Sequence, residues 1–199
     1  MTKEDREPGL IQGMELKMGF KHVMIDLETW GTHPFSMIIS IGACVFDPYA
    51  SMPEEIIGDQ FEVAIDPTSY QARIDPATIM WWIDPEREPA RAAWLKMPKL
   101  PLAAALDGFT DWLNTHGEDV RVWGNGSDFD NALLRQAYEM MKRDVPWSFR
   151  HNRCFRTLRS MVTDENLQYL GTQHTALADA ASQAIRANQI VRKLGTKLT

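Results

Sequence analysis

Four carboxylates and one histidine, in three separate segments, have the side chains needed for a metal site with an adjacent base. They are Asp26, Glu28, Asp130, His174 and Asp179. Carboxylate oxygens are the ligands that Mg²⁺ and Mn²⁺ prefer in proteins, whereas zinc favours histidine and cysteine. A histidine beside such a site can accept a proton near neutral pH. The chain has no H-E-x-x-H, P-loop or nucleophile-elbow motif, any of which would indicate a different hydrolase.

Asp26 and Glu28 flank Leu27 at the end of an apolar segment that is typical of a strand. Side chains alternate across a strand, so both carboxylates share one face while Leu27 points to the opposite, packed side. The Asp-x-Glu pattern occurs twice more, in the polar N-terminal tail and beside a proline, where solvated charge is expected. Only the middle pair follows an apolar strand, and its alternative interpretation is a strand end that faces solvent.

Asp130 lies in the segment GNGSDFDNALL, where a glycine-rich turn joins a short apolar strand to a helix. A helix N-terminus stabilises a nearby carboxylate, and aspartate is also a common N-cap. Capping is the favoured interpretation for Asp128. For Asp130, capping and metal binding both stay open.

His174 is the chain's only histidine that is followed by an aspartate five residues later. Five steps do not bring two residues onto one helix face, so His174 is expected in the loop before the helix that carries Asp179. A polar cap is the alternative for His174, and stabilisation by the helix dipole for Asp179. The helix has an unusually slim face, which would let it pack close to a sheet and is formed by Ala176, Ala180, Ala181 and Ala184.

The hydrophobic pattern predicts the elements that must position these side chains. Strands are expected over residues 21–27, 37–46, 61–65 and 120–123, and helices over 77–83, 87–96, 101–114, 129–141 and 175–194. An antiparallel meander followed by strand–helix units predicts an α/β domain with a mixed central sheet flanked by helices.

Composition bounds the interpretation further. A chain of 199 residues suits one domain, with residues 1–20 as a polar leader and 21–199 as the domain. No apolar run is long enough to cross a bilayer. Cys44 and Cys154 lack the spacing of metal ligands, so a zinc site is not expected. The default location is then the reducing cytoplasm, either of a bacterial cell or, for a phage protein, of its host. The net charge of −6 argues against a broad basic surface, although a carboxylate site is itself acidic until cations bind.

The segments IDLETWG, GNGSDFDNALL and HTALADA together resemble the three motifs of the DEDDh 3′→5′ exonucleases, which share the ribonuclease-H-like fold. The likeness spans residues 22–190, and Thr175 stands where the tyrosine subclass has its tyrosine. The form of the motifs is most similar to the exonuclease VIII-like group of bacterial and phage exonucleases. Asp128 departs from the pattern, because a small or neutral residue is expected there, but the register that uses Asp130 fits better.

The resemblance implies that His174 is a general base and that two Mg²⁺ or Mn²⁺ ions, about 3.5–4 Å apart, are held by Asp26, Glu28, Asp130 and Asp179. Asp26 would bridge the ions, with Glu28 and Asp179 on one and Asp130 on the other. The implied reaction is 3′→5′ hydrolysis of single-stranded nucleic acid or 3′ overhangs to 5′-nucleoside monophosphates, with DNA slightly favoured over RNA. A homodimer is a further implication. The alternative is a catalytically silent nucleic-acid-binding module, although such a descendant would be expected to lose ligands that are all present here.

Three residues near the motifs are candidates for contact with the substrate. Trp30 follows the first motif and could stack on a base, which is worth roughly 1–3 kcal/mol, or belong to the core. Asn125 could hydrogen-bond the substrate or form the turn. Phe129 could wedge against a base or pack beneath its helix.

Further candidates lie on the predicted helix at Trp81 and Trp82 and in a basic segment. At least one of the two tryptophans should be buried, which leaves the other to line the substrate groove. Arginines recur every three residues over 150–159. On a helix they would form a phosphate-binding stripe that includes Arg153 and Arg156. Scattered, solvated charge is the alternative.

Overall fold

The computed structural model describes residues 22–126, 128–163 and 169–198. Its strands are β1 (His22–Thr29), β2 (Ile38–Phe46), β3 (Ile57–Ile65), β4 (Lys99–Leu100), β5 (Arg121–Gly124) and β6 (Asn152–Cys154). Its helices are α1 (Pro76–Ile83), α2 (Glu88–Lys96), α3 (Leu102–Asn114), α4 (Asp130–Met140), α5 (Phe155–Arg159) and α6 (Ala176–Leu194), with 3₁₀ turns η1 (Pro53–Glu55), η2 (Pro85–Arg87) and η3 (Phe149–His151). The predicted leader, residues 1–20, lies outside the described ranges, and the extent of the domain over 21–199 stays a prediction.

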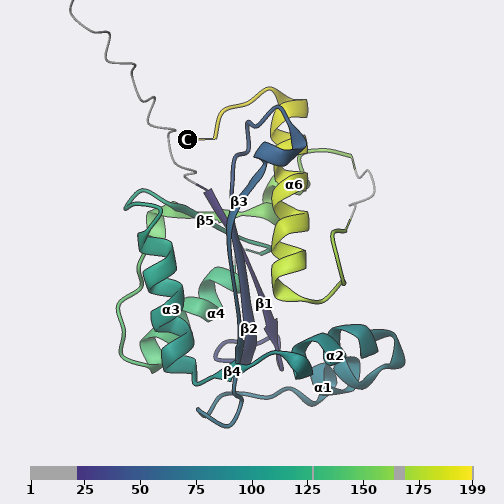
Figure 1. Cartoon of the computed structure of the whole chain (residues 1–199), viewed down its shortest axis with the longest axis vertical. Coiled ribbons are helices and arrows are strands. Elements are labelled where there is room, and N and C mark those ends of the chain that lie inside the picture. Colours follow the sequence, from purple (N-terminus) through teal and green to yellow (C-terminus); the bar gives the residue numbers. More distant parts are fainter. Residues whose placement is uncertain (1–21, 127, 164–168, 199) are drawn as a thin grey trace, which may run out of the picture.

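The strands form one mixed sheet in the order β4-β3-β2-β1-β5-β6. β1, β2 and β3 pair as an antiparallel meander, whereas β5 and β6 run parallel to β1, and β4 runs parallel to β3. The predicted mixed sheet is therefore confirmed. β1 lies between β2 and β5, with helices on both faces of the sheet, as Figure 1 shows.

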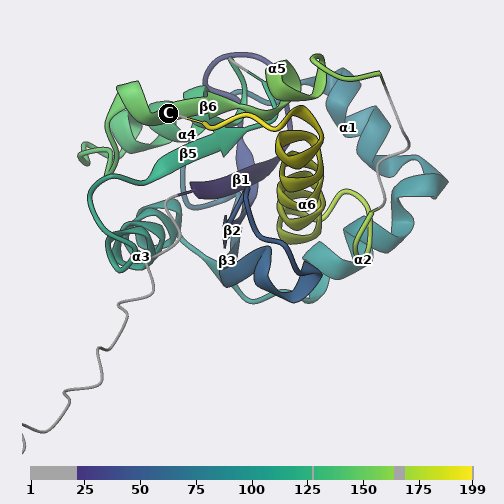
Figure 2. The same ribbon diagram turned by 90° about the horizontal axis from the view of Figure 1, so that it is seen from above.

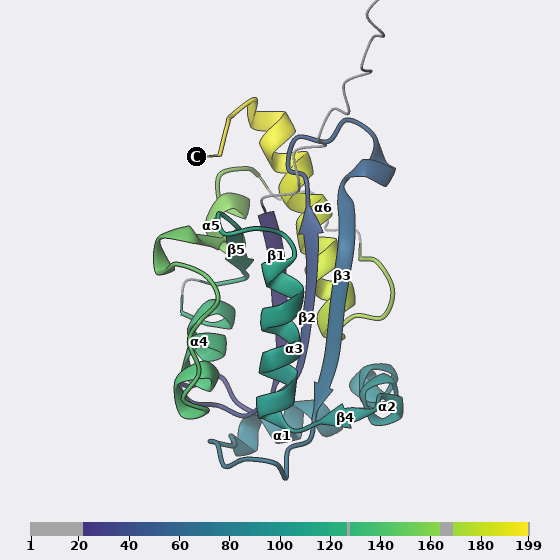
Figure 3. The same ribbon diagram turned by 60° about the vertical axis from the view of Figure 1, so that its left-hand side comes forward.

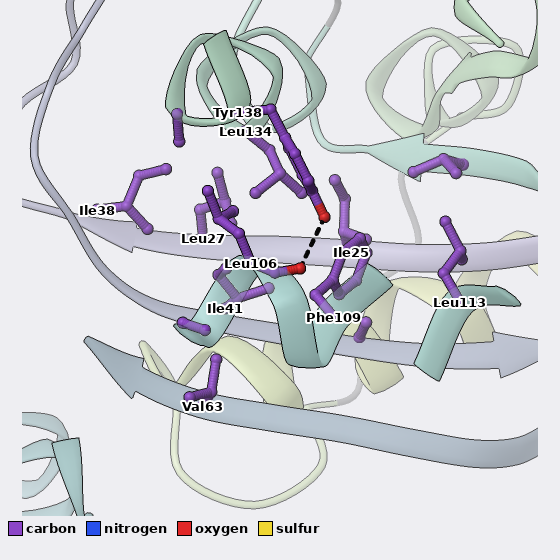
Figure 4. Packing of buried hydrophobic residues seen from close by; sticks show 14 of the residues in the cluster. Ile25, Leu27, Ile38, Ile41, Val63, Leu106, Phe109, Leu113, Leu134 and Tyr138 are labelled. Carbon is purple, nitrogen blue, oxygen red and sulfur yellow. Dashed lines mark hydrogen bonds between the residues drawn. The ribbon is translucent and has the colours of Figure 1, made fainter. Parts of the chain in front are cut away.

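The face of the sheet covered by α3 and α4 holds the main hydrophobic cluster. Ile25 and Leu27 of β1 pack there against Phe109 and Leu134 of these helices (Figure 4). The hydroxyl of Tyr138 donates a hydrogen bond of 3.1 Å to the carbonyl oxygen of Leu106, which ties α4 to α3. Leu27 therefore points to the packed side, as the alternation along the strand predicts.

The opposite face is covered by α6, whose small residues meet the other side of β1 and β2. Met24 and Cys44 form a second cluster there with Ala180 and Ala184. Helices α1 and α2 lie beyond the end of β1, next to the start of α6, as seen in Figures 2 and 3. The carboxyl end of β1 and the N-terminus of α6 thus meet at one edge of the molecule, beside α1. No described helix has the length and apolar character that a membrane span requires.

The structure differs from the predicted elements mainly where segments are short. β4, β6 and α5 were not predicted, because two to five residues give too little periodicity to register. β3 begins at Ile57 rather than at residue 61, since Asp59 and Gln60 expose their side chains and break the apolar pattern.

Candidate active site

Three of the predicted carboxylates come together where β1 ends and α6 begins. Asp26 and Glu28 project from the α6 face of β1, and Asp179 lies in the first turn of α6. One oxygen from each of the three lies within 4.8 Å of the others. Residues 153 positions apart in the chain therefore form one cluster of oxygen donors.

A glycine in β2 allows this approach. Gly42 pairs with Asp26 in the β1–β2 register. A Cβ atom at this position would overlap the carbonyl carbon of Ala176 and the backbone nitrogen of Leu177. The first turn of α6 thus rests directly on the backbone of β2, which a side chain larger than hydrogen would prevent.

Asp130 reaches the same edge from the other face of the sheet. One of its carboxylate oxygens accepts a hydrogen bond of 3.2 Å from the amide of Leu27, and the other accepts one of 2.7 Å from the amide of Asn125. β5 ends at Gly124, so the carboxylate occupies the edge of β1 that the next strand no longer pairs. Its first role is thus to tie the start of α4 to β1. The N-cap residue of α4 is Phe129 rather than Asp128, which lies one position earlier and is exposed.

Burial disfavours the charged form of all four carboxylates, and the charges of neighbouring carboxylates add to this effect at Asp26 and Glu28. Burial, and to a smaller extent the charges of Asp179 and Asp130, raise the pKa of Glu28 to about 8. Burial likewise raises the pKa of Asp130 to about 6 and that of Asp179 to about 6. Burial and then the charges of Asp130, Glu28 and Asp179 raise the pKa of Asp26 well above its usual value.

This arrangement fits divalent cations. All donors are oxygens, the set that Mg²⁺ and Mn²⁺ prefer. One oxygen of Asp179 is buried without a hydrogen-bond partner among the described residues, as expected of a metal ligand. The N-termini of α4 and α6 both point their dipoles at the cluster, which further favours its charged form.

His174 lies in the loop before α6, in the left-handed backbone region with φ of 63°. Its amide donates a hydrogen bond of 3.2 Å to Asp179. Its imidazole meets the ring of Trp81 edge to face, with 4.8 Å between the ring centroids. Burial and the charge of Arg87 lower the pKa of His174, so the imidazole is neutral at pH 7 and able to accept a proton.

Two functional candidates escaped the sequence motifs. The side-chain amide of Gln183 donates a hydrogen bond of 2.7 Å to Asp26. The spacing of four residues from Asp179 on one helix was the available signal, because such pairs share a face. For Trp81, the sequence predicts only that one of two adjacent tryptophans is buried and that the other lines the substrate groove. Trp82 is buried, as expected of at least one of them, and Trp81 is 38% exposed beside His174.

The aromatic and amide candidates for substrate contact lie close to the motifs but are already engaged. Trp30 is half-buried and packs on Trp94, with 5.9 Å between ring centroids. Phe129 packs against the α3–α4 cluster. Asn125 forms the turn that donates to Asp130.

The basic segment is divided among η3, β6 and α5 and so forms no single helical stripe. Arg156, in α5, lies beside Gly126, and its charge lowers the pKa of Asp130 against the larger effect of burial. Arg153 lies in β6, near His22 at the start of β1. Burial and then the charges of Arg121 and Arg153 lower the pKa of His22 to about 4. Of the two candidate arginines, Arg156 thus lies near the carboxylates and Arg153 does not.

The sequence profile of the family described as the 3′-5′ exoribonuclease Rv2179c-like domain matches residues 21–191. The chain belongs to this family. The Rv2179c-like domain therefore covers β1 to α6, the elements that bring the carboxylates together. Membership of this family makes the chain a 3′→5′ exonuclease. A search of curated proteins finds no match.

Solved structures similar to this Rv2179c-like domain share its fold at low sequence identity. The nuclease domain of 3′hExo, a DEDDh family member bound to rAMP, has a TM-score of 0.60 at 13% identity, covering 89% of this chain and 94% of that one. Cell-death related nuclease 4 (CRN-4) has a TM-score of 0.60 at 12% identity, covering 88% and 65% respectively. Pop2p of S. pombe, in a form with Mg²⁺ and Mn²⁺ bound, has a TM-score of 0.54 at 17% identity, covering 87% and 84%. The sheet is thus of the ribonuclease-H-like DEDDh nuclease type.

Proposed function

We propose that this Rv2179c-like domain removes nucleotides from the 3′ end of single-stranded RNA or of 3′ overhangs, releasing 5′-nucleoside monophosphates. The observation that carries the proposal is the convergence of Asp26, Glu28 and Asp179 within 4.8 Å from two elements far apart in the chain. Such a buried, mutually repulsive cluster is costly unless cations offset it. Its position beside a neutral histidine suits hydrolysis of a phosphodiester.

In this proposal two Mg²⁺ or Mn²⁺ ions are held by Asp26, Glu28, Asp130 and Asp179. When bound, such ions supply charge neutralisation and Lewis-acid activation at the phosphodiester. Gln183 orients Asp26 through its amide, and the backbone amides of β1 and the Gly124 turn orient Asp130. His174 accepts the proton of the attacking water.

Two features support the choice of substrate. The family description names exoribonucleases, so RNA is placed ahead of the DNA preference that the sequence suggested. The likeness of the motifs to the exonuclease VIII-like group keeps DNA as the competing substrate. Arg156 beside the carboxylates can hold a phosphate of the strand, because guanidinium groups match phosphate geometry. Trp30, Asn125, Phe129 and Arg153 stay candidates for weaker contacts.

The direct test uses 5′-labelled and 3′-labelled RNA and DNA of one sequence, single-stranded or with 3′ overhangs, in Mg²⁺, Mn²⁺ or EDTA. A metal-dependent ladder that shortens from the 3′ end is expected, faster on RNA and absent in Asp26→Asn. A faster ladder on DNA would reverse the choice of sugar. Binding of the RNA and DNA substrates without any cleavage would contradict the proposed hydrolysis and favour a catalytically silent binding module.

The assembly and location are proposed on separate grounds. The side chains of Met80, Ile83 and Leu95 on α1 and α2 are exposed and apolar, which supports a homodimer through these helices. Light scattering coupled to size-exclusion chromatography would decide this. Cys44 and Cys154 are unpaired, which supports the reducing cytoplasm as its location.

A further inference from the structure

We propose that Trp81 is a positioning residue that holds the imidazole of His174 for catalysis. The inference rests on the proposed role of His174 as the general base. It assigns to α1, a helix outside the DEDDh motifs, the task of fixing the orientation of that base.

His174 has few contacts of its own to fix its ring. Its amide is bonded to Asp179, but no hydrogen bond to the imidazole is made by any residue that the structure describes. The neighbouring backbone has two residues with positive φ, Gly171 at 72° and His174 at 63°. The ring contact with Trp81, at 4.8 Å and an interplanar angle of 83°, is therefore what limits rotation of the imidazole.

Trp81 is itself held firmly. The indole of the adjacent Trp82 donates a hydrogen bond of 2.8 Å to the carbonyl oxygen of Thr29, the residue after Glu28. Trp81 meets Trp82 edge to face at 5.1 Å, and the guanidinium of Arg87 lies 4.6 Å from the centroid of the Trp81 ring. A short chain of contacts thus runs from the metal-binding strand to the base.

This chain of contacts connects His174 to the residue next to Glu28 through α1 rather than through the loop that precedes α6. Among the described residues, Trp81 makes no ring contact, cation–π contact or hydrogen bond with Asp26 or Asp179, so we expect its removal to leave the metal ligands in place. A base that is free to rotate spends less time aligned with the attacking water. A misplacement of about 1 Å can cost on the order of 100-fold in rate, and we expect Trp81→Ala to lower the single-turnover rate by ~10- to 100-fold.

The molecule supplies a matched control. Trp112 of α3 meets His116 in the same edge-to-face way, at 4.9 Å and 72°, on the opposite face of the sheet from α6. Trp112→Ala therefore removes an equivalent aromatic pair away from the site. Trp81→Phe retains an aromatic ring beside His174 and should restore most of the rate that Trp81→Ala loses.

The experiment measures single-turnover rates and KM on a short RNA for the wild type, Trp81→Ala, Trp81→Phe, Trp112→Ala, His174→Ala and the double variant Trp81→Ala/His174→Ala. The positioning role predicts a lower maximal rate with KM changed less than about 2-fold. It also predicts that the double variant is no slower than His174→Ala alone, because the tryptophan acts only through the histidine. Thermal melting and Mn²⁺ titration of each variant confirm that the fold and the metal site are kept.

An RNA with an abasic 3′-terminal residue separates positioning from base stacking. The loss in Trp81→Ala should persist on that substrate, whereas a loss that disappears there would assign Trp81 to the nucleobase and overturn the inference. A Trp81→Ala rate equal to that of Trp112→Ala, or effects of Trp81→Ala and His174→Ala that multiply, would overturn it too. Full activity of His174→Ala would instead contradict the proposed role of His174 as the general base. Because that result comes from the His174 variant alone, it is distinguishable from a failure of the role proposed for Trp81.

Discussion

Gln183 donates a hydrogen bond of 2.7 Å to Asp26, so α6 both supplies a carboxylate of its own and holds one that belongs to β1. Asp179 and Gln183 are four residues apart on the same face of this helix. The side-chain amide oxygen of Gln183 (Oε1) is buried without a hydrogen-bond partner among the described residues, so it can accept a hydrogen bond from a water molecule in the site. The orientation of Asp26 therefore depends on the docking of α6.

Gln183→Ala should weaken Mn²⁺ binding or activity by about 10- to 100-fold, the usual effect of losing a partner that orients a metal ligand. Isothermal titration with Mn²⁺ and the rate on RNA would measure the two effects. Gln183→Glu should be worse, because it adds a negative charge to a cluster that is already repulsive. Unchanged Mn²⁺ affinity and rate in Gln183→Ala would show that Asp26 is oriented without it.

Gly42→Ala should displace the start of α6 and abolish activity. Its Cβ would overlap backbone atoms of Ala176 and Leu177, which cannot yield as a flexible side chain can. We expect a loss of about 1–3 kcal/mol in the free energy of unfolding, measured by urea denaturation. The control is Gly108→Ala in α3, where a Cβ makes an ordinary contact of 3.8 Å with Phe61 and should gain up to ~1 kcal/mol of helix stability.

Without divalent cations, stability should fall as pH rises. The folded-state pKa values of Glu28, Asp130 and Asp179 lie above their ordinary values, at about 8, about 6 and about 6. The folded chain thus holds these protons more tightly than the unfolded chain does. Their contribution is fully present below pH ~4 and is lost as pH rises through ~6 to ~8. Thermal melting in EDTA should show this fall, and Mg²⁺ or Mn²⁺ should raise Tm more at pH 8 than at pH 5.

Glu28→Gln should separate stability from activity. It removes a buried negative charge at nearly constant volume, so the metal-free variant should melt about 2–8 °C higher than wild type at pH 8, as expected for ~1–2 kcal/mol in a chain of this size. At pH 4 the difference should nearly vanish, because Glu28 is then protonated. Cleavage of RNA should be lost. A lower Tm at pH 8 would show that Glu28 makes stabilising contacts that outweigh its repulsion.

Arg156→Gln should raise KM for RNA by about 3- to 10-fold and reduce the dependence of binding on salt, because one phosphate contact is lost. Arg153→Gln is the comparison, since this arginine lies near the start of β1 rather than beside the carboxylates. Fluorescence anisotropy at several salt concentrations would measure both. An equal effect of the two substitutions would show that the bound RNA also extends along β6.

The part of the site that follows from local pattern could be predicted from the sequence. Alternation along β1 puts Asp26 and Glu28 on one face, and the alanine face of α6 brings Asp179 to them. The family resemblance supplied the order of the motifs. What local pattern does not contain is contact between distant segments: Gly42 beneath α6 and Trp81 against His174 depend on packing between elements far apart in the chain.

The position of α6 as the last described helix has a consequence for how the protein is made. The elements from β1 to α4 leave the ribosome before α6, carrying Asp26, Glu28 and Asp130 but neither His174 nor Asp179. A nascent chain at this stage lacks the proposed general base and one of the proposed metal ligands. In the proposed mechanism, cleavage therefore requires that α6 has been synthesised and has packed over Gly42.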